Sequence, residues 1–480
     1  MSQTITLDPL TRVEGHGRIS LILDNHNRVQ QARLHIVEFR GFEKFIQGRP
    51  YWEAPVLVQR LCGICPVSHH LAAAKAVDQL VGVDRLPPAA EKLRRLLHYG
   101  QILQSHALHF FYLSTPDLLF GVDHPIAQRN IVGILASYPD IALQGIRLRK
   151  YGQEVIRFIT GKRVHGTVAL PGGMNKALTP AEVSQLRQAL PPVLESAVAA
   201  VGLAKRLFLS QLDFSQLGWI ATAGMGLVDR NGALEFYDGN LRVTDANGTL
   251  RYDQLPCQNY ADTIQEEVKS WSYMKFPFLR EYGPEDGWYR VGPLARLNNC
   301  SYLTTPLAEQ QRQDFLAHGP QHAPLAYHWA RMIELLHSAE LIQQLLPDAD
   351  LCSADLITQG TPRQRGIGVI EAPRGTLIHD YQIDDEQRIV HANLIVSTTH
   401  NNQAMNQSIT QAAAQVFTGR VLEESLFNRL ETVVRAYDPC LSCATHALGK
   451  MPLKLELLDA QGHPLDCLVK DSQGVHRLPL

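Results

Sequence analysis

The first fifty residues alternate apolar and polar side chains. Alternating runs at residues 18–23 and 33–37 are separated by a polar turn at 24–27. A period of two is typical of a strand with one buried face, and a polar turn between two such runs predicts a β-hairpin. We therefore expect residues 1–50 to form an N-terminal β region.

From residue 51 the pattern changes, and apolar side chains recur at intervals of three and four residues. This spacing predicts helices with a buried face. The predicted helical segments are 54–60, 68–81, 89–113, 126–160, 180–212 and 322–346. Several of them exceed the usual length of a globular helix, which favours a bundle of long helices formed by residues 51–215 and 320–346.

Short alternating runs with turn residues predict β structure at residues 219–253 and again at 368–397. Helices are expected to return over 402–446. The predicted fold is mainly α with β decoration (α+β), in which a central bundle of long helices carries an N-terminal hairpin and peripheral β segments. We expect one domain over residues 1–446, followed by a C-terminal extension at 447–480.

Composition and charge narrow the function. The chain has 480 residues, of which 45% are hydrophobic, so it can bury a large core. A formal charge of -2 gives no electrostatic reason to expect nucleic acid or an anionic membrane as a partner. The N-terminus lacks the apolar region of a signal peptide, and no apolar run reaches the roughly 18 residues of a membrane helix. We expect a cytoplasmic protein, in which thiols stay reduced.

Two CxxC pairs lie near opposite ends of the chain, Cys62 with Cys65 and Cys440 with Cys443. Four thiolates form a suitable set for a soft metal if the fold joins the two ends. Each pair alone is also compatible with structural zinc or a thioredoxin-like site. Paired zinc motifs usually lie within roughly 20 residues of each other, whereas most of the chain separates these two.

The remaining cysteines lack paired spacing, and we expect ordinary buried side chains. They are Cys257, Cys300, Cys352 and Cys467.

The segments around both pairs resemble the signatures of one family. Residues 60–69 read RLCGICPVSH and residues 438–446 read DPCLSCATH, which fit the RxCGxCxxxH and DPCxxCxxH signatures of the nickel–iron hydrogenase large subunit. Further segments resemble the family in the same order: 12–16, 40–43, 105–109, 292–296 and 371–375. The stretch VSTTHN at 396–401 replaces a VPSTWN type, so the chain most resembles the cytoplasmic bidirectional, NAD-reducing members.

The resemblance implies a binuclear metal centre. All four cysteines would hold nickel, and Cys65 and Cys443 would also bridge to an iron that carries carbon monoxide and cyanide. Soft thiolates suit nickel that changes oxidation state. The implied activity is heterolytic cleavage or formation of dihydrogen, in which the terminal thiolate of Cys440 is the first proton acceptor.

The resemblance also implies roles for charged residues near the centre. Glu14 would receive the proton from Cys440, although a helix cap or an ion pair with Arg12 or Arg18 is the alternative. Arg374 would overhang the metals and act as a fixed positive charge. Bidentate hydrogen bonds from the acidic residues Asp117 and Asp438 would steady it.

A third, smaller metal is implied as well, normally magnesium, with Glu43, the carbonyl of Leu394 and His446 as ligands. An imidazole ligand suits iron or zinc as well as magnesium.

Further residues would surround the centre. His69 would hydrogen-bond a cysteine sulfur, Arg60 would lie in the surrounding shell, and Thr398 would donate its hydroxyl to a cyanide. His106 and His109 are expected to be core or proton-path residues rather than ligands.

The chain has no GxGxxG after a strand, no P-loop and no cysteines spaced for an iron–sulfur cluster. Electrons therefore need partner chains, and no NAD site is expected here. The resemblance implies an iron–sulfur small subunit, docked near the N-terminal CxxC, and flavin/iron–sulfur diaphorase subunits with FMN and NAD.

Large subunits of this family usually end at the histidine of the last motif after a maturation endopeptidase acts. We therefore expect cleavage between His446 and Ala447. The alternative is a permanent terminal strand at 453–458, which alternates well enough to form β structure.

Two other functions compete with the hydrogenase prediction. A complex I subunit that forms a quinone site shares this architecture but has generally lost the cysteine set. A non-enzymatic scaffold would hold zinc or an iron–sulfur cluster with the same four thiols.

Overall fold

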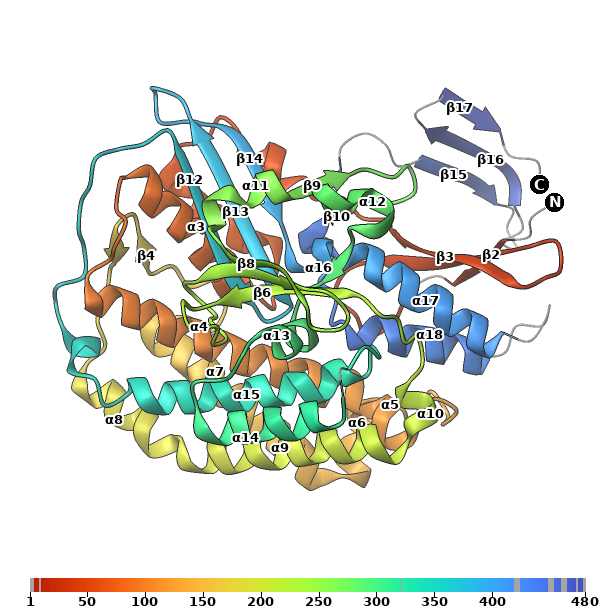
Figure 1. Ribbon diagram of the computed structural model, residues 1–480, viewed down its shortest axis with the longest axis horizontal. Helices are drawn as coiled ribbons and strands as arrows, with labels where there is room; N and C mark the ends of the chain where they lie inside the picture. The colour runs from red at the N-terminus through yellow and green to blue at the C-terminus, as the bar shows by residue number, and fades with distance from the viewer. Residues whose placement is uncertain are drawn as a thin grey trace.

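Long helices form the centre of the molecule, and small sheets lie around them (Figure 1). The computed structural model describes residues 4–7, 10–319, 321–417, 424–447, 453–458, 464–471 and 474–477. The longer helices are α3 (Pro66–Leu80), α4 (Pro88–Leu108), α7 (Pro139–Thr160), α8 (Pro180–Ala189), α9 (Pro191–Ser210), α14 (Pro306–Ala317), α15 (Ala326–Leu345), α17 (Asn402–Val416) and α18 (Glu424–Ala436). The short ones are α1 (Phe42–Phe45), α2 (Ala54–Leu57), α5 (Thr115–Phe120), α6 (Ile131–Ser137), α10 (Leu212–Ser215), α11 (Tyr260–Thr263), α12 (Gly283–Asp286), α13 (Pro293–Asn299) and α16 (Ser397–His400).

The sheets are small and mostly antiparallel. They follow the orders β1-β2-β3, β11-β6-β7-β8, β12-β13-β14, β15-β16-β17, β10-β9 and β4-β5. Their strands are β1 (Thr4–Leu7), β2 (Gly17–Leu23), β3 (Val29–Ile36), β4 (Ala169–Leu170), β5 (Gly173–Met174), β6 (Ala223–Val228), β7 (Asn240–Thr244), β8 (Leu250–Leu255), β9 (Ile264–Glu267), β10 (Phe276–Leu279), β11 (Tyr289–Arg290), β12 (Arg365–Ala372), β13 (Gly375–Ile383), β14 (Ile389–Ile395), β15 (Leu453–Leu458), β16 (Pro464–Asp471) and β17 (Gly474–Arg477).

The predicted N-terminal hairpin is confirmed as β2–β3. The carboxylate of Asp24 accepts hydrogen bonds from the backbone N–H groups of His26 and Arg28, at 2.8 and 2.9 Å, and so closes the turn. Both predicted β regions in the middle of the chain are confirmed as well, as β6–β8 and β12–β14.

Two predicted helices are interrupted by proline. The predicted helix at 126–160 is divided into α6 and α7 at Pro139, and the one at 180–212 into α8 and α9 at Pro191. Proline has no N–H for the preceding turn and starts a new helix more easily than it continues an old one. The predicted helix at 89–113 ends as α4 at Leu108 and continues as a wider π-helical turn at His109–Ser114.

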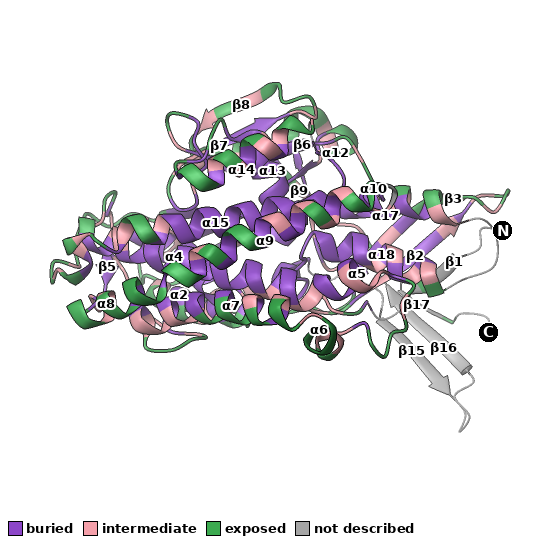
Figure 2. Cartoon of the chain, turned by 90° about the horizontal axis from the view of Figure 1, so that it is seen from below, coloured by how far each residue is buried: buried purple, intermediate pink, exposed green. Residues whose placement is uncertain are grey.

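The bundle is built from α4, α7, α9 and α15, which lie side by side with their inner faces buried (Figure 2). Glycines let α4 and α7 approach closely. A Cβ on Gly152 would lie 2.6 Å from the carbonyl oxygen of Gly100 and 2.8 Å from the Cβ of Gln104. At such a contact a backbone must shift to admit even one methyl group.

Helix α3 lies across the β12–β13 hairpin, again through glycine. A Cβ on Gly368 would lie 2.0 Å from the carbonyl oxygen of Ala72, and one on Gly366 would lie 2.0 Å from that of Ala76. This close contact fixes the N-terminus of α3 relative to the loop between β12 and β13. The candidate site is built on those two places.

Some expectations about cysteine differ from the structure. Cys300 is buried as expected, but Cys257 is half-buried and Cys352 is exposed. The side chain of Cys467 lies outside the described residues. None of the helices in the described ranges combines the length and the apolar character that a membrane crossing needs.

We predict that Gly152→Ala lowers the free energy of unfolding by about 1–3 kcal/mol, because the new methyl group meets the α4 backbone. The matched control is Gly202→Ala on α9, whose Cβ would meet only the flexible tip of Arg206, at 3.4 Å. This control should be neutral or stabilising by up to about 1 kcal/mol, since alanine favours helix. Thermal unfolding of the purified protein gives both values, and equal stability of the two variants would contradict the prediction.

Candidate metal centre

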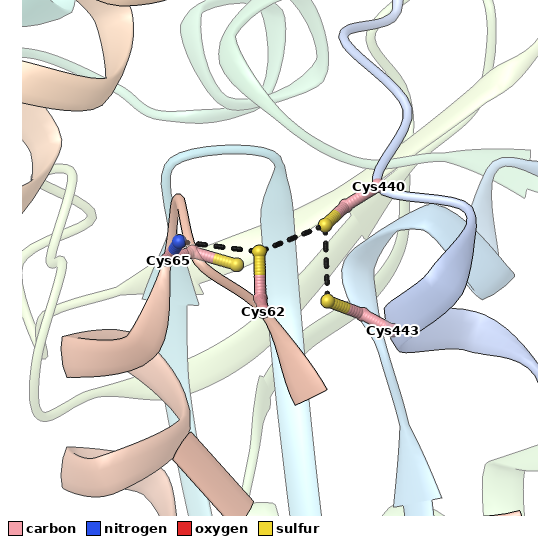
Figure 3. Close-up of side chains that lie close together, drawn as sticks. All are labelled: Cys62, Cys65, Cys440 and Cys443. Carbon is pink, nitrogen blue, oxygen red and sulfur yellow. Dashed lines mark hydrogen bonds between the residues drawn. The ribbon is translucent and has the colours of Figure 1, made fainter. Parts of the chain in front are cut away.

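The four cysteines of the CxxC pairs meet at one place, as predicted (Figure 3). Their Sγ atoms all lie within 4.8 Å of one another and all four residues are buried. The Sγ of Cys440 lies 3.2 Å from that of Cys62 and 2.9 Å from that of Cys443. Within the described residues this is the only group of three or more potential ligands from His, Cys, Asp and Glu.

Each pair is held by a tight turn. Cys62 follows the 3-10 turn Val58–Leu61, and Cys65 precedes the first residue of α3. The backbone N–H groups of Ile64 and Cys65 point at the Cys62 sulfur, at 3.2 and 3.3 Å. Such N–H groups stabilise a thiolate in the same way that they stabilise other anions at helix N-termini.

Main-chain pairing brings the two ends of the chain together. Glu14 forms a parallel β-bridge with Cys440, and the N–H of Leu441 donates to the carbonyl of Glu14 at 3.0 Å. On the other side of the motif, Thr445 pairs with Met274 in an antiparallel bridge. The C-terminal motif is therefore fixed from both sides by backbone hydrogen bonds.

The thiols of Cys65, Cys440 and Cys443 have shifted pKa values. Hydrogen bonds from the thiols of Cys440, Cys443 and Cys62 lower the pKa of Cys65 well below its ordinary value. Burial raises the pKa of Cys440 and of Cys443 well above theirs. Four negative charges cannot accumulate in such a dry cluster unless a cation joins them. A soft metal ion therefore fits this donor set.

Arg374 is the permanent cation beside the thiols. It lies in the loop between β12 and β13, and its Nε and Nη2 donate to the carbonyl oxygen and to Oδ1 of Asp438, at 2.7 and 3.0 Å. Burial alone would lower the pKa of Arg374, but Asp438 and the thiolates of Cys440, Cys65 and Cys62 raise it well above its ordinary value. Arg374 keeps its charge.

The prediction that Asp117 contacts Arg374 is wrong. Asp117 forms ion pairs with Arg12, Arg435 and Arg129, and none with Arg374 in the described part of the chain. Asp117 lies at the start of α5, beyond the π-helical turn, where it joins the N-terminal segment to α18. Asp438 accepts from Arg374 through one carboxylate oxygen and through its backbone carbonyl. The prediction that both carboxylate oxygens of Asp438 bind Arg374 is therefore also wrong.

Glu14 lies against the C-terminal motif. Its Oε1 accepts a very short hydrogen bond from the hydroxyl of Ser442, and its Oε2 accepts one from the Ser442 N–H at 3.2 Å. Neither Arg12 nor Arg18 pairs with this carboxylate among the described residues, because Arg12 contacts Asp117 and the carbonyl of Leu113. The role of Glu14 as a proton acceptor stays a prediction. Ser442 was missed, although it stands between the two cysteines of the motif.

Thr398 and His69 both lie near the sulfur of Cys65. Thr398 lines a cavity of about 10 Å³ beside Cys65 and Arg374, and its Oγ1 accepts from the N–H of Cys440 at 2.9 Å. A hydrogen bond from His69 contributes to the low pKa of Cys65, and His69 Nδ1 also lies 3.2 Å from Nε2 of His379.

Arg60 does not surround the centre as expected. Its side chain is exposed and forms no hydrogen bond or ion pair with any described residue. It belongs to the outer surface near the N-terminal pair.

The ammonium group of Lys275 lies at the predicted third metal site, where the sequence did not predict a cation. Glu43 accepts hydrogen bonds from the N–H of Leu394 at 2.9 Å and from Nζ of Lys275 at 3.0 and 3.1 Å. Lys275 also contacts Glu266 at 3.3 Å. Both ring nitrogens of His446 are buried without a described partner, and burial lowers its pKa to about 3. A neutral imidazole with a free lone pair suits a metal ligand, but Lys275 already neutralises Glu43.

Both histidines of the 105–109 segment are buried in the core. His106 Nε2 lies 3.0 Å from Oε2 of Glu334, and His109 Nε2 lies 2.7 Å from the carbonyl oxygen of Arg435. Burial lowers the pKa of His106 to about 4. Neither joins the cysteine group.

With this geometry established, comparison with known proteins identifies the family. A sequence model described as nickel-dependent hydrogenase matches residues 40–124 and 228–446, and one described as HoxL-like matches residues 4–39. The chain belongs to the nickel-dependent hydrogenase family. The resemblance seen at the two CxxC signatures is thereby confirmed.

Relatives match nearly the whole chain. The chain is 44% identical to the NAD-reducing hydrogenase HoxS subunit beta of Cupriavidus necator, over 97% of this chain and 99% of that protein. It is 43% identical to one chain of the F420-non-reducing hydrogenase of Methanothermobacter marburgensis, over 95% of this chain and 98% of that one.

Solved structures show the same fold. A crystal structure of an NAD+-reducing [NiFe]-hydrogenase in the H2-reduced state matches with a TM-score of 0.90 and 56% identity, over 92% of this chain and 99% of that one. The fold is also similar to that of the Dm. baculatum [NiFeSe]-hydrogenase, with a TM-score of 0.76 at 22% identity, over 93% and 100% of the chains.

We predict that Cys443→Ser abolishes hydrogen turnover and leaves a metal-deficient chain, since a hard hydroxyl replaces a soft thiolate at the centre. Cys352→Ser is the matched control, because Cys352 is exposed and outside the cluster. Elemental analysis of both purified variants measures nickel per chain. Wild-type nickel content in Cys443→Ser would contradict the assignment.

Proposed function

We propose that this chain is the catalytic subunit of a hydrogenase that exchanges electrons between dihydrogen and NAD through partner subunits. The observation that carries the proposal is the convergence of four buried thiols from both ends of a nickel-dependent hydrogenase chain. The coupling to NAD is supported by its similarity to the NAD-reducing hydrogenase of C. necator and to the NAD+-reducing [NiFe]-hydrogenase structure.

Cys62, Cys65, Cys440 and Cys443 would hold nickel, and Cys65 and Cys443 would also hold an iron that carries carbon monoxide and cyanide. When bound, this centre would supply the electron-accepting half of heterolytic dihydrogen cleavage. The protein residues supply the rest. Thr398 keeps a hydroxyl hydrogen to donate into the cavity, since its oxygen already accepts from Cys440.

Protein side chains would accept the proton released from dihydrogen and pass it on. The Cys440 thiolate would accept the proton, because burial raises the pKa of this thiol. Glu14 is held against the same motif by its backbone bridge and by Ser442. We propose that the proton leaves Cys440 for Glu14, and that Arg374 stabilises the negative charge left among the sulfurs.

Glu43, the carbonyl of Leu394 and His446 would form the magnesium site. The nitrogens of His446 have no hydrogen-bond partner in the described part of the chain, which supports a ligand role. Lys275 must then give up its ion pair with Glu43 when the metal binds, because an ammonium and a divalent cation compete for the same carboxylate.

Electrons would leave through a small iron–sulfur partner and then through diaphorase subunits that carry FMN and NAD. Exposed aromatic and apolar side chains gather on the segment before the N-terminal pair, which suits a protein interface. They are Phe39, Phe45, Trp52 and Val56. Exposed Arg60 lies beside them in sequence. A reducing compartment, the cytoplasm, keeps the four thiols available for metal.

The most direct test is hydrogen-dependent NAD+ reduction by the purified complex that contains this chain. The proposal expects NAD+ to be reduced under hydrogen gas, with no comparable reduction when the chain is left out. Hydrogen oxidation that reduces an artificial dye but not NAD+ would overturn the coupling to NAD.

We predict that Glu14→Gln preserves nickel and iron but suppresses hydrogen/deuterium exchange between gas and water, because an amide cannot relay the proton. Glu431→Gln is a matched control, since Glu431 also bonds to the N-terminal segment, through Thr11, but does not contact the motif. Gas-phase mass spectrometry measures the exchange. Unchanged exchange in Glu14→Gln would remove Glu14 from the relay.

A specific endopeptidase is proposed to cut between His446 and Ala447. Ala447 is buried, and its N–H donates to the carbonyl of Tyr273 at 3.0 Å. The endopeptidase must therefore cut before Ala447 forms its hydrogen bond with Tyr273, or after that hydrogen bond has broken. We predict that intact-mass spectrometry of the active complex finds a chain that ends at His446, and a chain that retains residues 447–480 would contradict this.

A further inference from the structure

Glu38 connects the buried relay to the surface. The β2–β3 pairing continues one step past Gly17 and Ile36, because the N–H of Val37 donates to the carbonyl of His16 at 3.3 Å. Just beyond this step the side chains of His16 and Glu38 meet, with Nδ1 of His16 3.1 Å from Oε2 of Glu38. The His16 side chain is 73% exposed, whereas that of Glu38 is 23% exposed.

The other oxygen of the same carboxylate points inward. Oε1 of Glu38 is buried and has no hydrogen-bond partner among the described residues. A Cβ on Gly15 would lie 2.7 Å from this oxygen and 2.7 Å from the N–H nitrogen of Ser442. That same N–H of Ser442 donates to the Glu14 carboxylate.

The inner oxygen of Glu38 and the carboxylate of Glu14 therefore both lie near the backbone N–H of Ser442. Gly15 has a φ of 85° and no side chain, so it leaves open the space between Glu38 and this N–H. Any other residue would place a methyl group against Glu38, Ser442 and Leu441.

A structural ion pair does not account for this arrangement. An exposed His–Glu pair adds little to stability, and it uses only the outer oxygen of Glu38. The inner oxygen is costly to bury without a partner. A proton delivered from Glu14 would satisfy it.

We propose that Glu38 takes the proton from Glu14 and passes it to His16, which releases it at the surface. The proposal rests on the proposed relay through Cys440 and Glu14. In the first transfer the O–H bond of the Glu14 carboxylic acid breaks and an O–H bond forms on the inner oxygen of Glu38. A half-turn of the carboxyl group then presents the proton to Nδ1 of His16, and the imidazolium loses its Nε2 proton to water.

The experiment compares Glu38→Gln, Glu38→Asp, His16→Gln and Glu14→Gln in the complete complex. The first readout is exchange of deuterium gas with water, which needs the exit path. The second is conversion of para- to ortho-hydrogen, which needs only reversible splitting at the centre. Glu91→Gln on α4 is the matched control, because Glu91 also forms a partly exposed ion pair, with Arg95.

We expect Glu38→Gln to slow exchange by about tenfold or more while conversion and metal content stay near wild type. Glu38→Asp should restore part of the exchange, and added imidazole should rescue His16→Gln. Wild-type exchange in Glu38→Gln, with slow exchange in Glu14→Gln, would overturn the exit path and leave the proposed function standing. Equal loss of conversion and exchange in Glu38→Gln would show a structural role and also overturn it. Fast exchange in Glu14→Gln would instead remove the relay on which the exit depends.

Discussion

The rest of the site depends on backbone pairing between the two ends of the chain. The bridge between Glu14 and Cys440 and the bridge between Thr445 and Met274 hold the C-terminal motif between the N-terminal segment and the strand at Phe276–Leu279. The four sulfurs lie in one buried cluster, and the same bridge places Glu14, the second station of the proposed relay, beside the C-terminal pair. The proposed metal binding and proton transfer would thus share one structural support.

Burial gives this cluster its chemistry. Because the thiols are shielded from water, they cannot all ionise. The pKa of Cys65 is lowered and that of Cys440 is raised, and the cluster needs a cation to hold more negative charge. Arg374 supplies one charge that no proton loss can remove. The bundle and the β12–β13 hairpin make the dry environment, and the close approach of α3 to β12 through Gly366 and Gly368 places Cys65 beside Arg374.

Sequence patterns predicted much of this arrangement. The hairpin, the long helices and the meeting of the CxxC pairs follow from periodicity and from motifs that carry their own geometry. Pro139 and Pro191 mark the two helix breaks in the sequence, although the helical periodicity continues across both. The ion pairs of Asp117 with Arg12 and Arg435 and the ammonium of Lys275 beside Glu43 could not be predicted, because they depend on contacts between segments more than 100 residues apart.

Infrared spectroscopy of the purified complex tests the central claim most directly, since few other protein sites hold carbon monoxide and cyanide on a metal. The account predicts stretching bands of both ligands in a complex that also contains nickel. A complex that contains zinc at the four thiols and shows no such bands would contradict it.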